Sequence, residues 1–421
     1  MSATELTEQQ LAEEVRAWFA DAWDPDLPLV AWRERLVDAG WAVPAWSPRW
    51  FGRGLPEWAT AVVHGALRRA GGVATPLGGG MGLAAPTIYD HASDEVKGRF
   101  LRPTLTGELM WCQLFSEPTA GSDLAGLKTT AVRDGDDWIV NGQKVWNTSA
   151  DHADMGILVA RTDWDVPKHA GMTYLLIDMH QPGVEVRPIR QMNEHRSFNE
   201  VFLTDARVPH ANVVGREGDG WKVARGTLAH ERSFSTQRSV FFASGATGRV
   251  IDEARAEAAE YLKTYEWYPQ RMGRVDLLAE RAKATGRNTD PLVRNELVKV
   301  TSFHQTAEWT AARAKAAREM GRPPGSEGSI GKLALSLLAR GANRVHTSIA
   351  GAQGMLRDGP EQADAVVAEV LVSTPAQSIA GGTDEIQHNI LGENMLGLPK
   401  EPSPDRGRPF REEIQQAGSK P

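Results

Sequence analysis

Three short segments combine residue types that suit the binding of a flat, polar ligand. The first, LFSEPTAGSDLAGLKT at 114–129, is rich in small residues and hydroxyl groups. Small side chains would let backbone N–H groups and the hydroxyls of Ser116 and Ser122 approach a planar ligand, which bulky side chains would prevent. The alternative is a surface turn with one proline and two glycines, so this segment alone leaves both interpretations open.

The second segment, VNGQKVWNTSADHAD at 140–154, contains an aromatic ring and a hydroxyl two residues apart. In a regular strand, Trp146 and Thr148 would lie on the same side. The ring of Trp146 could then cover one face of a flat ligand while Thr148 bonds to its edge. A tryptophan buried in the core is the competing interpretation, and spacing alone favours it.

The third segment, SIAGGTDEIQHNILGENMLGLP at 378–399, combines a glycine pair with the start of a helix. Gly381–Gly382 permits a ligand to approach the backbone closely. Thr383 suits an N-cap, and the helix that follows would offer unpaired N–H groups and positive potential to a phosphate. Asp384 and Glu385 in the first turn would equally suit an ordinary capped helix, which is the alternative.

In this order and at these separations, the three segments resemble the acyl-CoA dehydrogenase family. The central pattern T/S-E-P-x-A-G-S-D is met by Ser116–Asp123. The sheet pattern N-G-x-K-x-W-I-T/S is met by Asn141–Thr148, with Asn147 at the usual apolar position. The late pattern G-T-x-E-I-Q is met by Gly382–Gln387, and a Leu-Gly-Leu-Pro sequence follows at 396–399.

The resemblance covers roughly residues 5–400 and implies FAD as the cofactor and an acyl-CoA as the substrate. It assigns Ser122 to the thioester substrate. The family completes each flavin site with an arginine from a neighbouring subunit, for which Arg287 is the best match; its surroundings, GRNTDP, depart from the usual R-K-x-F-G, and Arg294 is a rival. The positions assigned to the cofactor are Gln113, Leu114, Phe115, Ser116, Trp146, Thr148, Arg287, Thr383 and Glu385.

The position of the catalytic base departs from the common family pattern. Many members carry a glutamate immediately before the Gly-Thr of the late motif, where this chain has Gly381, and glycine cannot move a proton. A subset of the family places the glutamate on the first helix of the C-terminal bundle, in a pattern like L-x-x-E-R. The sequence Leu228–Arg232 matches that pattern, so the resemblance makes Glu231 the candidate base.

The helical surroundings of Glu231 support this assignment. Thr227, Leu228, Phe234 and Ser235 lie three or four residues away and would share a face with it. A carboxylate on such a face is partly desolvated, which raises its pKa and strengthens it as a base toward a carbon acid.

Other residues compete for the role of base. Glu231 and Arg232 could form an ordinary solvated pair on a helix. Asp384 and Glu385 lie nearer the late motif but follow the Gly-Thr, and the imidazole of His230 is a weaker candidate.

The predicted reaction is the FAD-dependent α,β-dehydrogenation of an acyl-CoA to the trans-2-enoyl-CoA. Two alternatives stay open: a flavin-dependent monooxygenase or N-hydroxylase of the same fold, and a non-catalytic or partner-requiring acyl-CoA dehydrogenase subunit. The resemblance further implies an electron-transferring flavoprotein as electron acceptor and a homotetramer or homodimer.

The elements that must position these residues change type along the chain, which predicts an α+β fold. Helices, then strands, then helices follow one another without the alternation of a doubly wound fold. We expect a helical N-terminal domain at 1–107, a central antiparallel β domain at 108–219, a C-terminal four-helix bundle at 220–400 and a polar tail at 401–421.

Periodicity and turn residues define the individual elements. Tight turns are expected at Asp134-Gly135-Asp136 and at Asn141-Gly142. The segment 266–291 is polar and is expected to connect two bundle helices. Helices are predicted at 4–22, 30–40, 58–71, 94–106, 222–265, 292–320, 329–354 and 384–396, and strands at 156–161, 173–178, 184–189 and 200–208.

Composition narrows the function classes further. The 421 residues carry a net charge of −7, which argues against a nucleic-acid partner. Cys112 is the single cysteine, so no internal disulfide and no thiolate cluster for a metal can form. The polar, acidic start and the lack of a long apolar run predict a cytoplasmic protein with no membrane partner.

Overall fold

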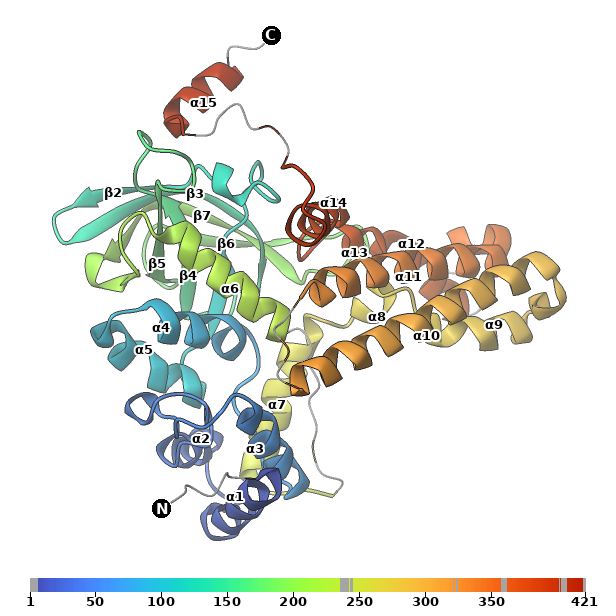
Figure 1. Ribbon diagram of the computed structural model, residues 1–421, viewed down its shortest axis with the longest axis horizontal. Coiled ribbons are helices and arrows are strands. Elements are labelled where there is room, and N and C mark those ends of the chain that lie inside the picture. Colours follow the sequence, from blue (N-terminus) through green and yellow to red (C-terminus); the bar gives the residue numbers. More distant parts are fainter. Residues whose placement is uncertain are drawn as a thin grey trace. The chain divides into compact units, whose positions relative to one another are not determined.

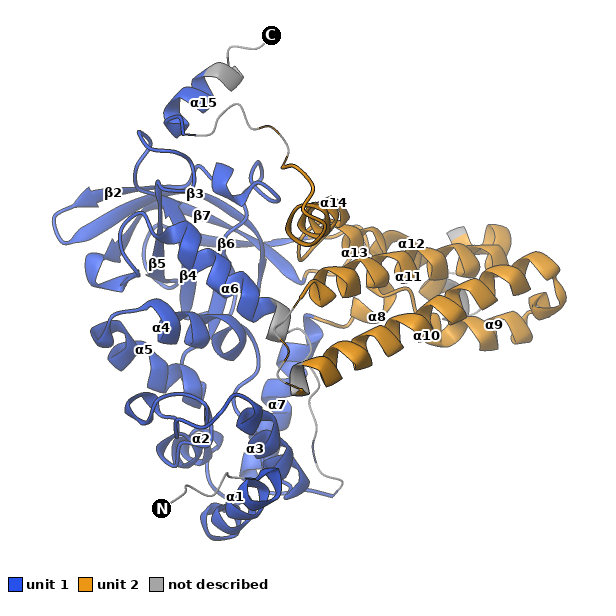
Figure 2. Cartoon of the chain, in the orientation of Figure 1, with its two compact units in different colours: residues 1–189, 197–264, 404–421 blue, residues 190–196, 265–403 orange. Residues whose placement is uncertain are grey.

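The computed structural model describes residues 7–234, 242, 245–320, 322, 325–356, 362–400, 402 and 407–418. Its chain forms two compact units (Figure 2). The first comprises residues 1–189, 197–264 and 404–421, and the second comprises 190–196 and 265–403. The first unit thus contains the N-terminal helices, the sheet and the two helices that follow the sheet, while the second is helical.

The N-terminal helices follow the predicted pattern closely. In the first of them, Thr7 forms a capping box with Gln10, and Leu11, Val15 and Phe19 are buried. A short helix at 85–91, which follows a π-helical turn at 80–84, was not predicted because its glycine-rich approach hides the periodicity. The helices are α1 (Glu8–Ala22), α2 (Leu29–Asp38), α3 (Trp58–Arg69), α4 (Ala85–His91) and α5 (Asp94–Thr106).

Eight strands form one sheet, which is largely antiparallel (Figure 1). The strand order is β6-β7-β3-β2-β4-β5-β8, and β1 pairs with β4 in parallel. Every residue of β4 is buried. The strands are β1 (Trp111–Leu114), β2 (Thr130–Asp134), β3 (Asp137–Thr148), β4 (Met155–Arg161), β5 (Met172–Asp178), β6 (Val184–Ile189), β7 (Phe198–Pro209) and β8 (Val213–Val214).

Only one of the two predicted turns is present. The Asp134-Gly135-Asp136 turn joins β2 to β3 as expected. The prediction of a turn at Asn141-Gly142 is wrong, because both residues lie inside β3, where the pairing with β7 shifts register. Glycine is required there for a packing reason, since a Cβ on Gly142 would lie 2.4 Å from Oγ1 of Thr129.

The single helix predicted at 222–265 is instead two helices, α6 (Gly220–Phe234) and α7 (Arg249–Lys263). Gly245 and Gly248 before α7 have φ of 75° and 117°, which a continuous helix does not allow. A Cβ on Gly248 would also lie 2.6 Å from Cβ of Pro25. Helix α6 packs against β4 and β5 of the sheet and against α4 (Figure 1).

The second unit is built from two long helices and several short ones. The long helices at 291–319 and 327–350 match the predictions for 292–320 and 329–354. The expected connection at 266–291 instead contains two short helices, and α14 continues into a π-helical turn at 390–395. The helices are α8 (Tyr268–Arg271), α9 (Leu278–Ala284), α10 (Pro291–Glu319), α11 (Glu327–Ala350), α12 (Gln362–Ser373), α13 (Pro375–Ile379) and α14 (Asp384–Asn389).

The polar tail is not simply irregular, because it contains helix α15 (Phe410–Gly418), which belongs to the first unit. The backbone N–H of Phe410 donates to the carbonyl of Val166 at 2.9 Å. The Phe410 ring stacks on Trp164, and Arg411 pairs with Asp165 at 2.7 Å. The tail therefore docks on the loop between β4 and β5.

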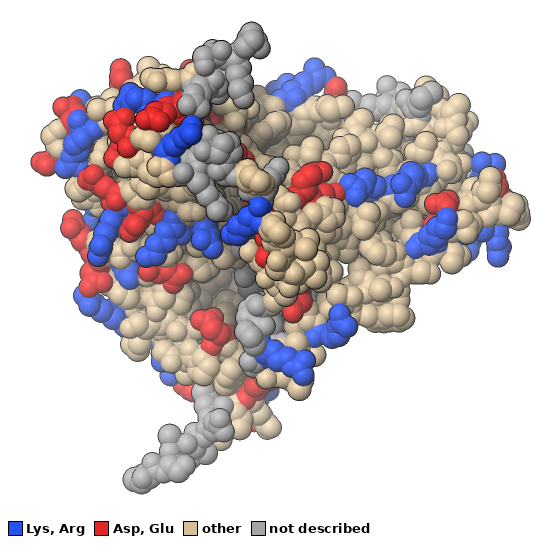
Figure 3. Space-filling model, turned by 45° about the horizontal axis from the view of Figure 1, so that its top comes forward, with Lys and Arg blue, Asp and Glu red and all other residues tan. Residues whose placement is uncertain are grey.

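The architecture confirms the predicted α+β class, with a helical N-terminal region, an antiparallel-rich sheet and a C-terminal helical region. Over the face shown in Figure 3, basic and acidic side chains are interspersed. Among the described residues, no helix is long and apolar enough to cross a membrane.

Candidate functional site

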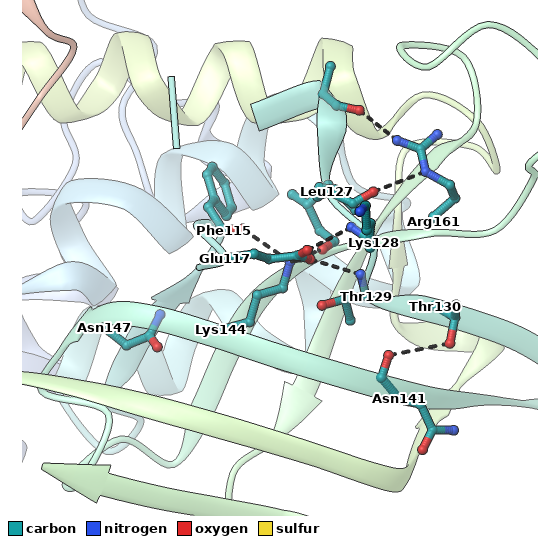
Figure 4. Close-up of polar contacts among 12 residues, drawn as sticks. Phe115, Glu117, Leu127, Lys128, Thr129, Thr130, Asn141, Lys144, Asn147 and Arg161 are labelled. Carbon is teal, nitrogen blue, oxygen red and sulfur yellow. Dashed lines mark hydrogen bonds and ion pairs between the residues drawn. The ribbon is translucent and has the colours of Figure 1, made fainter. Parts of the chain in front are cut away.

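A buried ion pair joins the first two sequence motifs (Figure 4). The Nζ of Lys144, in the NGQKVW segment, lies 2.9 Å from Oε1 of Glu117 in the SEP segment. The ammonium also donates to the carbonyls of Phe115 at 3.0 Å and Val159 at 2.8 Å. Because Lys144 is fully buried, these three acceptors replace the water that it loses on folding.

The carboxylate of Glu117 is equally well partnered. It accepts backbone N–H bonds from Lys128 at 2.7 Å and Thr129 at 2.8 Å. Burial raises the pKa of Glu117, but the charge of Lys144 and these hydrogen bonds outweigh it and hold that pKa below its usual value. Sequence reasoning missed this pair; the available signal was one carboxylate and one ammonium placed inside neighbouring apolar segments.

The pair fixes the backbone from which the first four candidate cofactor residues project. Gln113 and Leu114 end β1, and Phe115 and Ser116 follow it. Leu114 and Phe115 are buried, whereas Gln113 and Ser116 are half-buried and so are more accessible to a ligand. The carbonyl of Ser116 accepts the N–H of Val145 at 2.9 Å, which ties this loop to β3.

Trp146 is exposed rather than buried, which removes the interpretation as a core tryptophan. Its side chain is 58% exposed, and its φ of 64° falls where the pairing between β3 and β7 is irregular. The ring meets Phe198 edge-on, with centroids 5.9 Å apart. Trp146 and Thr148 were predicted to lie on the same side of a regular strand. The regular alternation of side chains between the two faces of β3 does not continue through Trp146, although Thr148 is also half-exposed.

Asn147 is a residue of the site that the sequence reasoning did not select. Its Nδ2 donates to the carbonyl of Gln113 at 2.7 Å, so it links the two motifs beside Trp146. Its buried Oδ1 has no hydrogen-bond partner among the described residues. The polar replacement at a usually apolar position was the only signal in the sequence.

Ser122, the candidate for the thioester, lies exposed in the loop after Glu117. Arg161 on β4 holds this loop in place by donating to the carbonyls of Ala125 at 2.6 Å and Leu127 at 3.1 Å (Figure 4). Burial lowers the pKa of Arg161 to about 10. A salt bridge of 2.9 Å between Lys168 and Asp123 fastens the loop from outside.

Glu231 lies half-buried near the end of α6. One turn earlier on the same face, the buried hydroxyl of Thr227 lies 3.0 Å from the hydroxyls of Thr87 and Tyr174. That face of α6 is therefore directed toward α4 and β5 rather than toward solvent. Ser235, expected on the same face, is outside the described residues.

His230 is engaged elsewhere, since its Nε2 lies 2.8 Å from Oδ2 of Asp90. Helices α4 and α6 approach closely at this point: a Cβ on Gly226 would lie only 2.6 Å from Nε2 of His91. Burial lowers the pKa of His91, which leaves its imidazole neutral near pH 7.

The late motif forms a turn of two glycines followed by a capped helix. Gly381 and Gly382 have φ of 70° and 86°, where glycine is favoured. Thr383 caps α14 by accepting the N–H of Ile386 at 3.2 Å. Glu385 in the first turn is exposed, so it can reach a ligand.

Asp384 is buried and pairs with Arg340 at 2.7 Å. Although burial raises its pKa, Ser336 and Arg340 outweigh that effect and hold the pKa of Asp384 below its usual value. A carboxylate of lowered pKa that is engaged with a cation is a poor base, which argues against it as the alternative to Glu231.

Arg287 lies on the turn before α10 and is 46% exposed. It donates to the carbonyl of Ser348 at 3.1 Å and lies 3.4 Å from Asp290. The rival Arg294 donates to the carbonyl of Asn288 at 3.3 Å. The contact of Arg287 with a flavin of a neighbouring subunit stays a prediction.

The first unit thus unites 113–116 with 145–148 and also carries Ser122 and Glu231, while Arg287, Thr383 and Glu385 belong to the second. The residues of the first unit fit a flat, polar ring such as a flavin: the exposed indole of Trp146 can cover its face, and the unpartnered Asn147 Oδ1 can accept a hydrogen bond from its edge. The Gly381–Gly382 turn permits close backbone approach.

Comparison with known proteins identifies the family of the chain. The chain matches the N-terminal domain of the acyl-CoA dehydrogenases at 1–108, their middle domain at 112–206 and their C-terminal domain at 270–396. The chain belongs to the acyl-CoA dehydrogenase family, whose members are FAD-dependent oxidoreductases. It is accordingly an enzyme of acyl-CoA dehydrogenation.

Individual relatives cover nearly the whole chain. It is 33% identical to the acyl-CoA dehydrogenase IpdE1 of Mycolicibacterium smegmatis, over 93% of this chain and 98% of the relative. It is 34% identical to IpdE1 of Mycobacterium tuberculosis, over 88% of each chain. Among solved structures, the ChsE4-ChsE5 complex from Mycobacterium tuberculosis is similar with a TM-score of 0.59 and 26% identity, covering 95% of this chain and all of that chain.

Proposed function

We propose that this enzyme oxidises an acyl-CoA thioester to the trans-2-enoyl-CoA, with Glu231 as the base that removes the α proton. The observation that carries the proposal is the position of Glu231 on the inward face of α6, together with a glycine at position 381, where the common family pattern has a glutamate. Thr227, one turn away on the same face, is fully buried against α4 and β5, so the Glu231 carboxylate is partly shielded from bulk water.

The chemistry of the proton step follows from the acidity of the α carbon. Hydrogen bonds to the thioester carbonyl stabilise the enolate charge that develops when the α proton leaves. Ser122, exposed on a loop fastened by Arg161, is the proposed contact to the thioester. The α proton passes to the Glu231 carboxylate, and the hydrogen that leaves the β carbon departs as hydride.

Bound FAD supplies the hydride acceptor for this reaction. The residues proposed to hold it are those at 113–116, Trp146, Thr148, Thr383, Glu385 and, from a neighbouring subunit, Arg287. The Glu117–Lys144 pair has a supporting part, because it sets the backbone on either side of the flavin-facing residues. Alignment of the α and β carbons by a rigid site reduces the entropy cost of the reaction.

We also propose a homo-oligomer that passes its electrons to an electron-transferring flavoprotein. Helix α10 exposes large apolar side chains, among them Leu292 at 76%, Val298 at 62% and Trp309 at 66%, which favours association. A partner-requiring subunit is the second candidate, because the similar ChsE4-ChsE5 structure is a complex. The mass and flavin content of the protein purified alone distinguish the two.

The reaction is tested by anaerobic titration of the purified enzyme with straight-chain, branched and ring-bearing acyl-CoA thioesters. A substrate should bleach the oxidised flavin and yield the enoyl-CoA, whereas a thioester without β hydrogens should leave the flavin oxidised. If no thioester bleaches the flavin, yet the chemically reduced enzyme hydroxylates a substrate with oxygen, the monooxygenase alternative replaces the proposal.

A further inference from the structure

Helix α11 presents three polar side chains along one face toward the segment that carries the late motif. Lys332, Ser336 and Arg340 are four residues apart, which places them in one row on the helix. We call these three residues the α11 row. Ser336 is fully buried, and the side chain of Lys332 is 14% exposed, so the row lies largely inside the second unit.

The first part of the row holds the chain before the glycine turn. Lys332 donates to the carbonyl of Gln377 and, at 3.2 Å, to the hydroxyl of Ser336. The Ser336 hydroxyl in turn donates to the same carbonyl of Gln377 at 3.1 Å. Arg271 adds a bond of 2.9 Å from its Nε to the side-chain oxygen of Gln377.

The last part of the row holds the chain on both sides of the turn. Nη1 of Arg340 donates to the hydroxyl of Ser378 at 2.8 Å and to Oδ2 of Asp384 at 2.7 Å. Lys332 lies 3.8 Å from the other carboxylate oxygen of Asp384. Only residues 379–383 separate these two anchor points, and they contain the turn of Gly381 and Gly382.

A turn with two adjacent glycines needs such external anchors. Glycine populates many backbone conformations, so neither Gly381 nor Gly382 can hold its left-handed φ without help from its neighbours. Asp384 is the first residue of α14 and follows Thr383 directly. Fixing the Asp384 carboxylate therefore fixes the Thr383 cap as well.

We propose that Asp384 and the α11 row are positioning residues that hold the turn of Gly381, Gly382 and Thr383 in the conformation that binds FAD. The inference rests on the proposed function of that turn. None of these side chains is assigned to the reacting atoms; they act through the backbone of the turn and through Thr383.

The test measures the affinity of the FAD-free protein for FAD, with Asp384→Asn, Arg340→Gln and the double variant. Each single variant removes a charge-assisted hydrogen bond, so we expect FAD to bind about tenfold more weakly or worse. The double variant should lose less than the sum of the two single variants, because the two share the Arg340–Asp384 contact. Arg344→Gln, which removes an exposed arginine one turn further along α11, is the matched control and should bind FAD as wild type.

Two further measurements separate positioning from plain stabilisation. Asp384→Glu keeps the charge but lengthens the side chain, so it should keep the melting temperature of the FAD-free protein while its FAD affinity falls. The double variant removes both charges of the Asp384–Arg340 pair, while Lys332 keeps its bonds to Gln377 and Ser336, so the variant stays informative where a single variant does not fold.

The outcomes distinguish this inference from the proposed function. If Asp384→Asn and the double variant melt earlier but bind FAD as tightly as wild type, the row only fastens helices together and the positioning role is overturned. If FAD affinity falls as expected but no thioester reduces the wild-type flavin, the positioning role stands and the proposed reaction fails.

Discussion

Each unit contains one buried carboxylate that holds a segment with candidate cofactor residues, and the two carboxylates differ in how completely their partners are buried. Glu117 and its partner Lys144 have side chains that are 6% and 0% exposed. Asp384 is 8% exposed, but its partner Arg340 is 45% exposed. Both carboxylates hold a backbone turn in place. Glu117 does so through a partner that is fully buried, whereas Asp384 does so through a partner that is partly exposed to solvent.

The difference in solvent access predicts that the two ion pairs contribute differently to the stability of the fold and to the binding of FAD. An ion pair without access to water cannot be rescued by solvent when one partner is removed. When the carboxylate is removed from a pair whose cation is partly exposed, water can compensate, because the remaining cation recovers its hydration. We therefore expect loss of the Glu117–Lys144 pair mainly to lower the free energy of unfolding, and loss of the Asp384–Arg340 pair mainly to weaken FAD binding.

The largest effect is expected for Lys144→Met. This change leaves the Glu117 carboxylate buried without its cation and should lower the free energy of unfolding by about 3–5 kcal/mol. Denaturant unfolding of the FAD-free protein measures it. Lys168→Met, which opens the exposed pair with Asp123, is the control and should cost less than about 1 kcal/mol. Equal losses of unfolding free energy in Lys144→Met and Lys168→Met would contradict the distinction between a buried and an exposed ion pair.

The pH dependence of unfolding is the next largest effect. The pKa of Glu117 is lower in the folded than in the unfolded chain, so its stabilisation is complete above the unfolded value of about 4.3 and is lost as the pH falls through the folded value.

Wild-type stability should accordingly fall steeply below about pH 4. In Glu117→Gln, which is less stable at pH 7, the difference from wild type should shrink as the pH falls. A constant difference between the two proteins down to the acid transition would show that Glu117 is not charged in the folded protein.

A smaller loss of stability is expected for Asp384→Asn. The exposed part of Arg340 stays solvated, so the free energy of unfolding should fall by only about 1–2 kcal/mol. The same denaturant series measures it. A loss as large as that of Lys144→Met would remove the distinction between the two pairs.

The smallest effect is expected for Phe410→Ala in the tail helix. Phe410 lies 4.0 Å from the Arg161 guanidinium, but Arg161 keeps its bonds to the carbonyls of Ala125 and Leu127 without it. Helix α15 should undock while global unfolding changes by less than about 1 kcal/mol. Hydrogen exchange should then rise in 410–418 and not in β4. Faster exchange in β4 as well would show that the tail supports the loop of Ser122.

Local signals in the sequence were sufficient for much of the fold. The first N-terminal helix, the long helices of the second unit and the Asp134-Gly135-Asp136 hairpin all depend on neighbours within a few residues, and all were predicted. The break between α6 and α7 was not predicted, because Gly248 is required by its approach to Pro25, far away in the sequence.

The site was less accessible to sequence reasoning for the same physical reason. The resemblance identified Trp146, but its exposure results from an irregularity in pairing with a strand more than fifty residues away. The pairs Glu117–Lys144 and Arg340–Asp384 join residues that are 27 and 44 positions apart. Periodicity places a residue on a face of its own element, and only the fold shows what that face meets.

The most direct test of the account isolates the proton step from dehydrogenation. A thioester with a quaternary β carbon, such as tert-butylacetyl-CoA, has α protons but no β hydrogen to transfer. In heavy water, the wild-type enzyme should exchange its α protons for deuterium, and Glu231→Gln should do so at least about a hundredfold more slowly while binding FAD normally. Exchange in Glu231→Gln at the wild-type rate would show that another group removes the proton and would contradict the assignment of Glu231.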